Sequence, residues 1–190
     1  MSGVEQAKGD REGAQGSYMG MVEEGTQNPR GEALVEELRW VHGIISRNLA
    51  TIAALVADIN GGAPAAQIRA QITELAATSA IWTLRVNCLR YCGLVHSHHH
   101  GEDTMLFPGL RRVNPTICPV IDKLEADHVV IAGSLDAVEA AAERILTDES
   151  ARVELAGSLD DLSAHVIVHL DYEEANLNPT LRRLSAWPFG

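Results

Sequence analysis

Two stretches of the sequence repeat each other and decide the fold: residues 98–112 read HHHGEDTMLFPGLRR, and residues 169–183 read HLDYEEANLNPTLRR. Seven of the 15 aligned positions are identical, beginning with a histidine and a glutamate four residues later. A spacing of four residues places two side chains on the same face of a helix, one turn apart. The repeat therefore predicts two helices that each present a His–Glu pair, with similar chemistry from the two halves of the chain.

Apolar side chains continue this helical spacing on both sides of the two stretches, at alternating steps of three and four residues. Such a stripe is typical of helices that pack along one face. It predicts four helices: one over about 32–60, one over about 65–106, a third that opens at Asn114-Pro115 and a fourth that begins near Asp148–Ser150. Four helices with mostly short connections predict an all-α, antiparallel up-and-down four-helix bundle.

Proline and glycine mark the expected boundaries of these helices. We expect Pro108 to end the second helix and Pro179 to end the fourth, because proline lacks the backbone N–H that continues a helix. Gly93 is a candidate kink or break in the long second helix. Residues 1–30 are rich in Gly, Glu, Gln and Ser, which predicts a flexible tail in front of a helical domain over residues 31–186.

Each predicted helix carries one histidine at a position where the stripe predicts an apolar side chain. Glutamates follow two of these histidines by one turn, on the same face. A buried carboxylate is costly without a partner, and two that face each other cost more. A bound metal ion removes this cost, because it coordinates both carboxylates and neutral imidazoles. The sequence therefore predicts a buried metal site with six ligands: His42, His98, Glu102, His128, His169 and Glu173.

Other histidines lie near the predicted ligands. His98 sits in a histidine-rich tract, and we predict it as the metal ligand because of the repeat and its spacing to Glu102. His99 with Asp103, also four residues apart, is the competing pair. The rest of the tract is expected either to bind metals nonspecifically or to be solvated. His165 lies one turn before His169 and close to its face, so we expect it either to be a fifth histidine ligand or to donate a hydrogen bond behind the ligands.

Charge and cysteine content exclude several classes of protein. The net charge of −11 argues against a broad surface for nucleic acid or for an anionic membrane. The three cysteines predict no disulfide framework, and Cys88 and Cys92, one turn apart, are expected to be buried core thiols rather than a redox pair. No apolar run reaches the ~20 residues of a membrane span, and the polar N-terminus is not that of a secretory signal. We therefore expect a cytoplasmic protein.

The motifs that carry this chemistry resemble those of the hemerythrin and hemerythrin-like (HHE cation-binding) family over about residues 34–184. They are Leu-x3-His42, His98-x3-Glu102-Asp-x2-Leu-Phe-Pro108, Asp127-His128 and His169-x3-Glu173-Glu-x2-Leu-x-Pro179. The resemblance implies an oxo- or hydroxo-bridged di-iron centre inside the bundle, with manganese or zinc as less expected metals. By motif, each iron would take two histidines and share two bridging glutamates: His42 and His98 for one, His128 and His169 for the other, with Glu102 and Glu173 between them.

Two departures from the oxygen-carrying hemerythrins bear on function. Leu124 stands where those proteins have a further histidine, and the last carboxylate is Glu173, four residues after its histidine, where they have an aspartate five residues after. The ligand set is closer to the four-His, two-Glu type of bacterial hemerythrin-like and iron-centre-repair proteins. Fewer protein ligands leave more open coordination positions, which favours reaction over reversible storage.

The resemblance therefore implies a non-haem di-iron protein that binds or reacts with a small ligand such as dioxygen, nitric oxide or peroxide. Turnover of the peroxidase or nitric oxide reductase kind is one interpretation, and binding without turnover is the other. The alternative function is that of an iron-storage or iron-donor protein, or of an iron- or oxygen-sensing interaction protein. A homodimer or a protein redox partner is compatible with each function, and no nucleic acid or membrane partner is expected.

Overall fold

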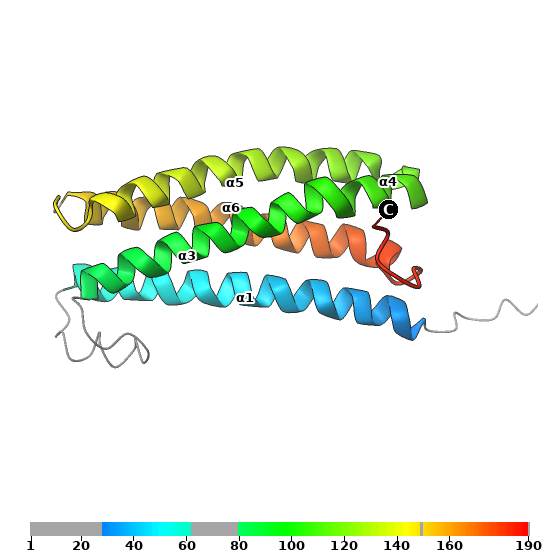
Figure 1. The fold of residues 1–190 in the computed structure, drawn as a ribbon, viewed down its shortest axis with the longest axis horizontal. Helices are drawn as coiled ribbons and strands as arrows, with labels where there is room; N and C mark the ends of the chain where they lie inside the picture. Colours follow the sequence, from blue (N-terminus) through cyan, green and yellow to red (C-terminus); the bar gives the residue numbers. More distant parts are fainter. Residues whose placement is uncertain (1–27, 62–79, 149, 190) are drawn as a thin grey trace, which may run out of the picture.

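Four long helices lie side by side in the computed structural model, which describes residues 28–61, 80–148 and 150–189 (Figure 1). They are α1 (Pro29–Asn60), α3 (Ala80–Gly101), α5 (Cys118–Arg144) and α6 (Ala151–Leu181). Both α1 and α5 pack against α3 and α6. The chain runs from right to left in Figure 1 along α1 and α5, and from left to right along α3 and α6. The described residues contain no β-strand, and the prediction of an all-α four-helix bundle is confirmed.

Two apolar clusters fill the bundle, and a layer of polar side chains separates them. On α1, His42 stands between Leu38 of one cluster and Ile45 of the other. On α5, His128 occupies the equivalent place. The predicted stripes of α1, α5 and α6 are buried at every position whose side chain the structure describes. The apolar stripes thus place the polar residues among them in the interior.

The helical path does not end at Pro108, which corrects the sequence prediction. A π-helical turn, η1 (Glu102–Leu106), follows α3 directly and leads into α4 (Phe107–Val113), whose first turn contains Pro108. The Phe107 N–H donates to the Glu102 carbonyl, five residues earlier. A wider turn suits this position because, in a regular α-helix, a proline ring clashes with the carbonyl four residues before it.

Pro179 and Gly93 also lie inside helices. The prediction that Pro179 ends the fourth helix is wrong, because α6 continues to Leu181. Leu181 is fully buried in the apolar cluster at the C-terminal end of α6, and its burial favours continuation of the helix past Pro179. Helix α3 runs unbroken through Gly93, and the irregularity of this helical path falls at η1 instead.

The third and fourth long helices begin close to the predicted positions. Asn114 leaves the helical conformation (φ −145°, ψ 81°), and Pro115 opens a short 3-10 turn, η2 (Pro115–Ile117), directly before α5. Helix α6 begins after Ser150, whose N–H and hydroxyl donate to the Asp148 carboxylate at 2.9 and 2.7 Å. Both starts therefore fall close to the predicted residues, although neither Asn114 nor Ser150 caps its helix with a side-chain hydrogen bond.

Some predicted segments lie outside the described residues. The expected tail is described only from Asn28 onward, where Pro29 and Arg30 already begin α1, and the first part of the predicted second helix, 65–79, is not described. By length and composition alone, α1 is apolar enough to cross a membrane, because an 18-residue window within Pro29–Asp58 has a mean hydropathy of 1.3. This is weak evidence for a membrane span, since the core helix of a bundle passes the same test, and α1 packs here against α3 and α6.

Candidate metal centre

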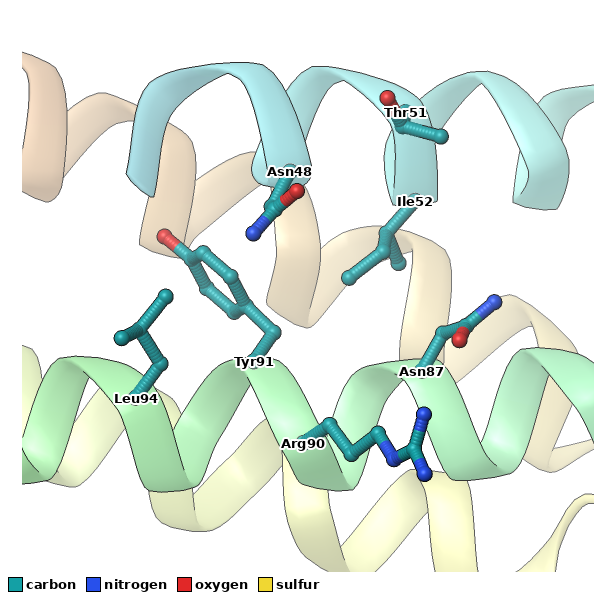
Figure 2. A pocket seen from close by; sticks show the side chains of 7 residues that line it. All are labelled: Asn48, Thr51, Ile52, Asn87, Arg90, Tyr91 and Leu94. Atoms are coloured by element: carbon teal, nitrogen blue, oxygen red, sulfur yellow. The ribbon is translucent and has the colours of Figure 1, made fainter. Parts of the chain in front are cut away.

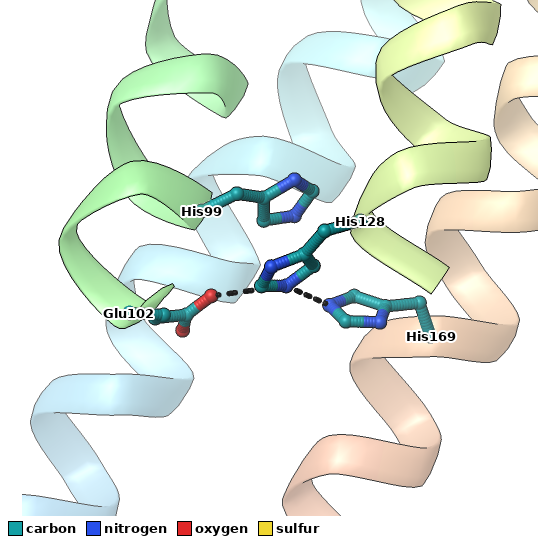
Figure 3. A group of neighbouring side chains, drawn as sticks. All are labelled: His99, Glu102, His128 and His169. Carbon is teal, nitrogen blue, oxygen red and sulfur yellow. Dashed lines mark hydrogen bonds and ion pairs between the residues drawn. The ribbon is translucent and has the colours of Figure 1, made fainter. Parts of the chain in front are cut away.

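The histidines and glutamates predicted as ligands meet in the polar layer between the two apolar clusters. Two groups of side chains each bring their ligand atoms within 4.8 Å of one another, and they share one glutamate. Each group draws on residues of α3, η1 and α6; α1 adds to the first and α5 to the second. The first group is His42, His98, Glu102 and Glu173, and the second is His99, Glu102, His128 and His169 (Figure 3).

Glu102 lies between the two groups. It is the first residue of the π turn, and its two carboxylate oxygens contact histidines of different helices. Its Oε1 is 3.2 Å from His98 Nε2, and its Oε2 is 3.5 Å from His128 Nε2. In Figure 3, the Glu102 carboxylate and the His128 and His169 rings follow one another, and the Nε2 atoms of these two histidines are 3.2 Å apart.

Glu173 takes the corresponding position on α6. One of its oxygens, Oε2, is 3.5 Å from His42 Nε2 and 3.6 Å from His169 Nε2. Both glutamates therefore contact one histidine of each group, which is the position that a carboxylate needs in order to bridge two metal ions.

His99 belongs to the cluster, although the sequence favoured His98 and left His99 with Asp103 as the competing pair. Its ring is buried and stacks on the His128 ring, with 4.0 Å between ring centroids (Figure 3). His98, in contrast, has its ring 5.2 Å from that of His42 on α1. Both histidines reach the site because α3 packs against α1 and α5, so that its inner face is wide. The signal for His99 was a second stripe at steps of three and four: Cys92, Val95, His99 and Glu102.

Carboxylates outside the cluster hold the far ring nitrogens of two histidines. His42 Nδ1 is 3.0 Å from Glu174, and His128 Nδ1 is 2.8 Å from Asp103. Glu174 and Asp103 each come directly after one of the two central glutamates, so the internal repeat extends to these partners. A carboxylate at Nδ1 favours the proton on that nitrogen and leaves Nε2 free to bind a metal.

His165 lies outside the cluster, and its prediction as a metal ligand is not supported by its position. It is exposed, and its Nδ1 forms a hydrogen bond of 3.0 Å with the Ser134 hydroxyl of α5. The His165 side chain therefore lies at the surface of the bundle beside α5, outside the inner layer that His169 occupies.

Several buried polar atoms of the cluster have no hydrogen bond to another described residue. Both carboxylate oxygens of Glu102 and Glu173 and the Nε2 atoms of His42 and His98 are buried without a hydrogen-bond partner, although some of them approach one another closely. Buried polar groups in proteins are nearly always paired. Metal ions coordinate such oxygen and imidazole nitrogen atoms, so this donor set fits a metal centre.

Burial shifts the pKa values of the clustered histidines and glutamates in the directions that favour their uncharged forms. Desolvation lowers the pKa of His98 to about 3 and that of His169 to about 4. It raises the pKa of Glu173 to about 8, and together with the neighbouring Glu173 it raises the pKa of Glu102 well above its ordinary range. Neutral imidazoles are the form that binds metal, whereas the two carboxyl groups release their protons when metal binds.

A separate cavity of about 390 Å³ lies between α1 and α3 (Figure 2). Polar side chains of Asn48, Asn87 and Arg90 line it, and so does Tyr91, whose buried hydroxyl has no hydrogen-bond partner. No residue of the metal cluster lines this cavity. It is therefore not part of the metal site.

Helical bundles build metal sites from histidines and glutamates directed between their helices, and this cluster could hold metal ions in the same way. The family model described as hemerythrin HHE cation binding domain matches residues 67–181, more than half of the chain. The chain belongs to this family. The match covers α3, α5 and α6 but begins after α1, so His42 is assigned to the cluster by the structure alone. No significant match was found among curated proteins or among solved structures.

Proposed function

We propose that the protein holds a non-haem di-iron centre that binds or reacts with a small ligand: dioxygen, nitric oxide or peroxide. The observation that carries the proposal is the pair of ligand groups that share Glu102 in the interior of an HHE-family bundle. Two groups of four ligands favour two metal ions over one. The second central carboxylate, Glu173, contacts a histidine of each group and supports the same count.

Iron is the metal that we propose, with manganese or zinc less expected. Imidazole and carboxylate suit all three metals, whereas cysteine ligands would favour zinc. Cys88 and Cys92 lie in an apolar cluster, and burial raises the pKa of each thiol to about 12, so neither is a ligand. We assign the ligands to the two irons as follows: His42 and His98 to one, His99, His128 and His169 to the other, with Glu102 and Glu173 bridging.

When bound, the two iron ions would supply one-electron redox chemistry and open coordination positions for the small ligand. The chain's own residues would provide the surroundings for that chemistry. Asp103 and Glu174 orient the rings of His128 and His42 through Nδ1. The two apolar clusters border the polar layer on either side and limit the directions from which water can reach the ligands.

Metal content tests the first part of the proposal. After anaerobic loading with ferrous iron and removal of excess metal, we expect two iron ions per chain. Re-oxidation should give the visible absorption of a bridged diferric centre. A stoichiometry of one, or equal retention by a variant that lacks both Glu102 and Glu173, would contradict a bridged pair.

Stopped-flow mixing of the reduced, loaded protein with each small ligand separates binding from turnover. A reversible adduct with dioxygen would support a carrier or sensor, and catalytic consumption of peroxide or nitric oxide would support an enzyme. Transfer of iron to an apo acceptor without reaction toward any of these ligands would favour the iron-storage or iron-donor alternative.

We also propose a cytoplasmic location, without a nucleic acid or membrane partner, on the basis of the net charge of −11. A protein redox partner or a homodimer is compatible with this proposal. Cell fractionation tests the location, and association with the membrane fraction would contradict it.

A further inference from the structure

A second pocket, of about 310 Å³, reaches the metal cluster from the side where α1 and α3 face each other. His98 and Glu102 line it, so its inner end is formed by two of the proposed ligands. Among the described residues, no lysine or arginine lines the pocket. The walls are mainly apolar: Leu38, Val41, Met105, Leu106, Trp187 and Phe189.

The outer wall of this pocket comes from the segment that follows α6, residues 182–189. Trp187 and Phe189 both line the pocket, and their rings stack with 5.6 Å between centroids. The Trp187 indole Nε1–H donates to the Glu37 carboxylate on α1 at 2.9 Å. This hydrogen bond holds the wall against α1.

The same segment is held on its other side by α4. Arg112 donates a hydrogen bond of 3.3 Å to the Pro188 carbonyl oxygen. Gly109 permits the close approach, because a Cβ atom at this position would lie 2.0 Å from that oxygen. The wall is therefore fixed between α1 and α4, and a single methyl group at Gly109 would displace it.

The pocket lies at the group of ligands that has fewer histidines. The group with His42 and His98 has two, whereas the other has three, because His99 joins it. The internal repeat aligns His99 with Leu170, a buried apolar residue, so this third histidine has no counterpart. A metal ion with fewer protein ligands has more open coordination positions. A ligand that enters through the pocket thus meets the more open side of the centre.

The size and polarity of the pocket point to an organic ligand. A water molecule takes up about 30 Å³ in the liquid, so a diatomic molecule or hydrogen peroxide would fill only a small part of the pocket. Pockets of ~300–1,000 Å³ are of the size that holds organic ligands. Away from the proposed metal ions, no cationic side chain lines the described part of the pocket, so a negative charge in the outer part of a ligand would face Glu37 without a partner.

We propose that this pocket binds the apolar part of an uncharged organic hydroperoxide, R–OOH, in which R is an aryl or branched alkyl group, with Trp187 as the outer wall. The inference rests on the proposed function and names the peroxide class that the centre receives. In the reaction, R–OOH takes up two protons and one electron from each of two ferrous ions. The O–O bond breaks, R–OH and water form, and both irons become ferric.

Binding can be measured without redox chemistry. Zinc-loaded, ¹⁵N-labelled full-length protein is titrated with cumyl alcohol, the product that cumene hydroperoxide would leave. We expect the indole N–H signal of Trp187 to shift and to saturate, and that of Trp40, which is 64% exposed and does not line the pocket, to stay in place. A Trp187 signal that does not move up to the solubility limit of the alcohol would overturn the proposal.

Two variants test the wall by different routes. Trp187→Ala removes it, and Gly109→Ala displaces it without changing any lining residue. Each should raise the Kd for cumyl alcohol by about tenfold or more. Gly133→Ala is the matched control, since a Cβ atom there meets nothing within 4 Å. Equal Kd values in all of these variants would contradict the assignment of the wall.

Single-turnover oxidation of the ferrous protein connects the pocket to chemistry. We expect the rate with cumene hydroperoxide to saturate with concentration, and the ratio of its rate to that with hydrogen peroxide to fall in Trp187→Ala at equal iron content. Oxidation by neither peroxide, with cumyl alcohol still bound, would refute the proposed function but not the pocket. Oxidation by hydrogen peroxide without any binding of cumyl alcohol would refute the pocket alone.

Discussion

Glu173 is completely buried, and among the described residues neither of its carboxyl oxygens has a hydrogen-bond partner. Desolvation raises its pKa to about 8. A group whose pKa is raised by folding contributes stability that is complete below its unfolded pKa, ordinarily near 4.5. That contribution is lost as the pH rises through the folded value. Metal-free protein should therefore lose stability between these pH values, and Glu173 should contribute to this loss together with Glu102, whose pKa is also raised.

Glu173→Gln should remove part of this loss, because glutamine resembles the protonated acid and cannot ionise. Urea unfolding of metal-free protein at pH 6.5 and pH 9 measures it. From pH 6.5 to pH 9, the free energy of unfolding should fall in both proteins. We expect the fall to be about 2 kcal/mol smaller in the variant than in the wild type. The comparison starts at pH 6.5 because the lowered pKa values of the imidazoles add a loss of stability on the acid side.

The same variant should lose bridged iron, so its effects on the metal-free and loaded forms have opposite signs. Parallel pH dependence of the two metal-free proteins would mean that Glu173 is not the group responsible. The exposed Asp171→Asn, on the same helix, is a suitable control for the removal of one carboxylate.

His99 offers a second test at the residue scale. The internal repeat aligns His99 with Leu170, so His99→Leu would leave two histidines in each ligand group. Because the ring stacks on His128 and belongs to the second ligand group, we expect iron content to fall from two toward one per chain. His100→Ala, at an exposed neighbouring position, should retain both ions. Metal analysis of the two variants side by side decides the matter; equal retention would remove His99 from the ligand set.

At the scale of the helices, the sequence predicted faces better than it predicted ends. Stripes of apolar residues located α1, α5 and α6 and placed His42, His128 and His169 inside, since burial of a stripe follows from its spacing alone. Proline was a poorer guide. Pro108 and Pro179 both lie within helices, because a π turn accommodates the first and buried leucine packing continues the helix past the second.

A single stripe of residues along α3 does not predict that both His98 and His99 join the cluster, and the reason is geometric. A helix that packs against two neighbours has an inner face wide enough for adjacent residues to point to different partners. His98 lies toward α1, and His99 lies toward α5 and α6. Only the packing of all the helices specifies such a face. The same holds for the C-terminal wall, whose contacts join residues about 80 to 150 positions apart.

Three glycines in helices differ in the space that a Cβ atom would have at their positions. At Gly31 a Cβ atom would lie 2.1 Å from the Arg182 backbone oxygen, whereas at Gly157 it would meet nothing within 4 Å. We expect Gly31→Ala to destabilise the protein by ~1–3 kcal/mol through overpacking. Gly157→Ala and Gly133→Ala should each stabilise it by ~0.5–1 kcal/mol, because alanine loses less conformational freedom in a helix. Thermal unfolding of the three variants measures this, and a uniform change in Tm would contradict the contact at Gly31.

For the molecule as a whole, the protonation of the cluster predicts how metal uptake depends on pH. Glu102 and Glu173 have raised pKa values, and the histidines have lowered ones. Loading at pH 7 should therefore release up to two protons per chain, all from the carboxyl groups. The release should decline toward pH 9, where Glu173 is already ionised. Calorimetric titration with a divalent metal in buffers of different ionisation enthalpy measures it. A release that instead grows only below pH 6.5 would assign the protons to histidines.

Both ligand groups include a residue of α6, the last of the four long helices: Glu173 in one and His169 in the other. During synthesis on the ribosome the chain emerges from its N-terminal end, so α1, α3 and α5 leave the exit tunnel while each group is still incomplete. The full set of donors is available only after translation has passed residue 169 for one group and residue 173 for the other. Metal insertion is thereby tied to the closing steps of translation, and a prematurely truncated nascent chain would carry no intact centre.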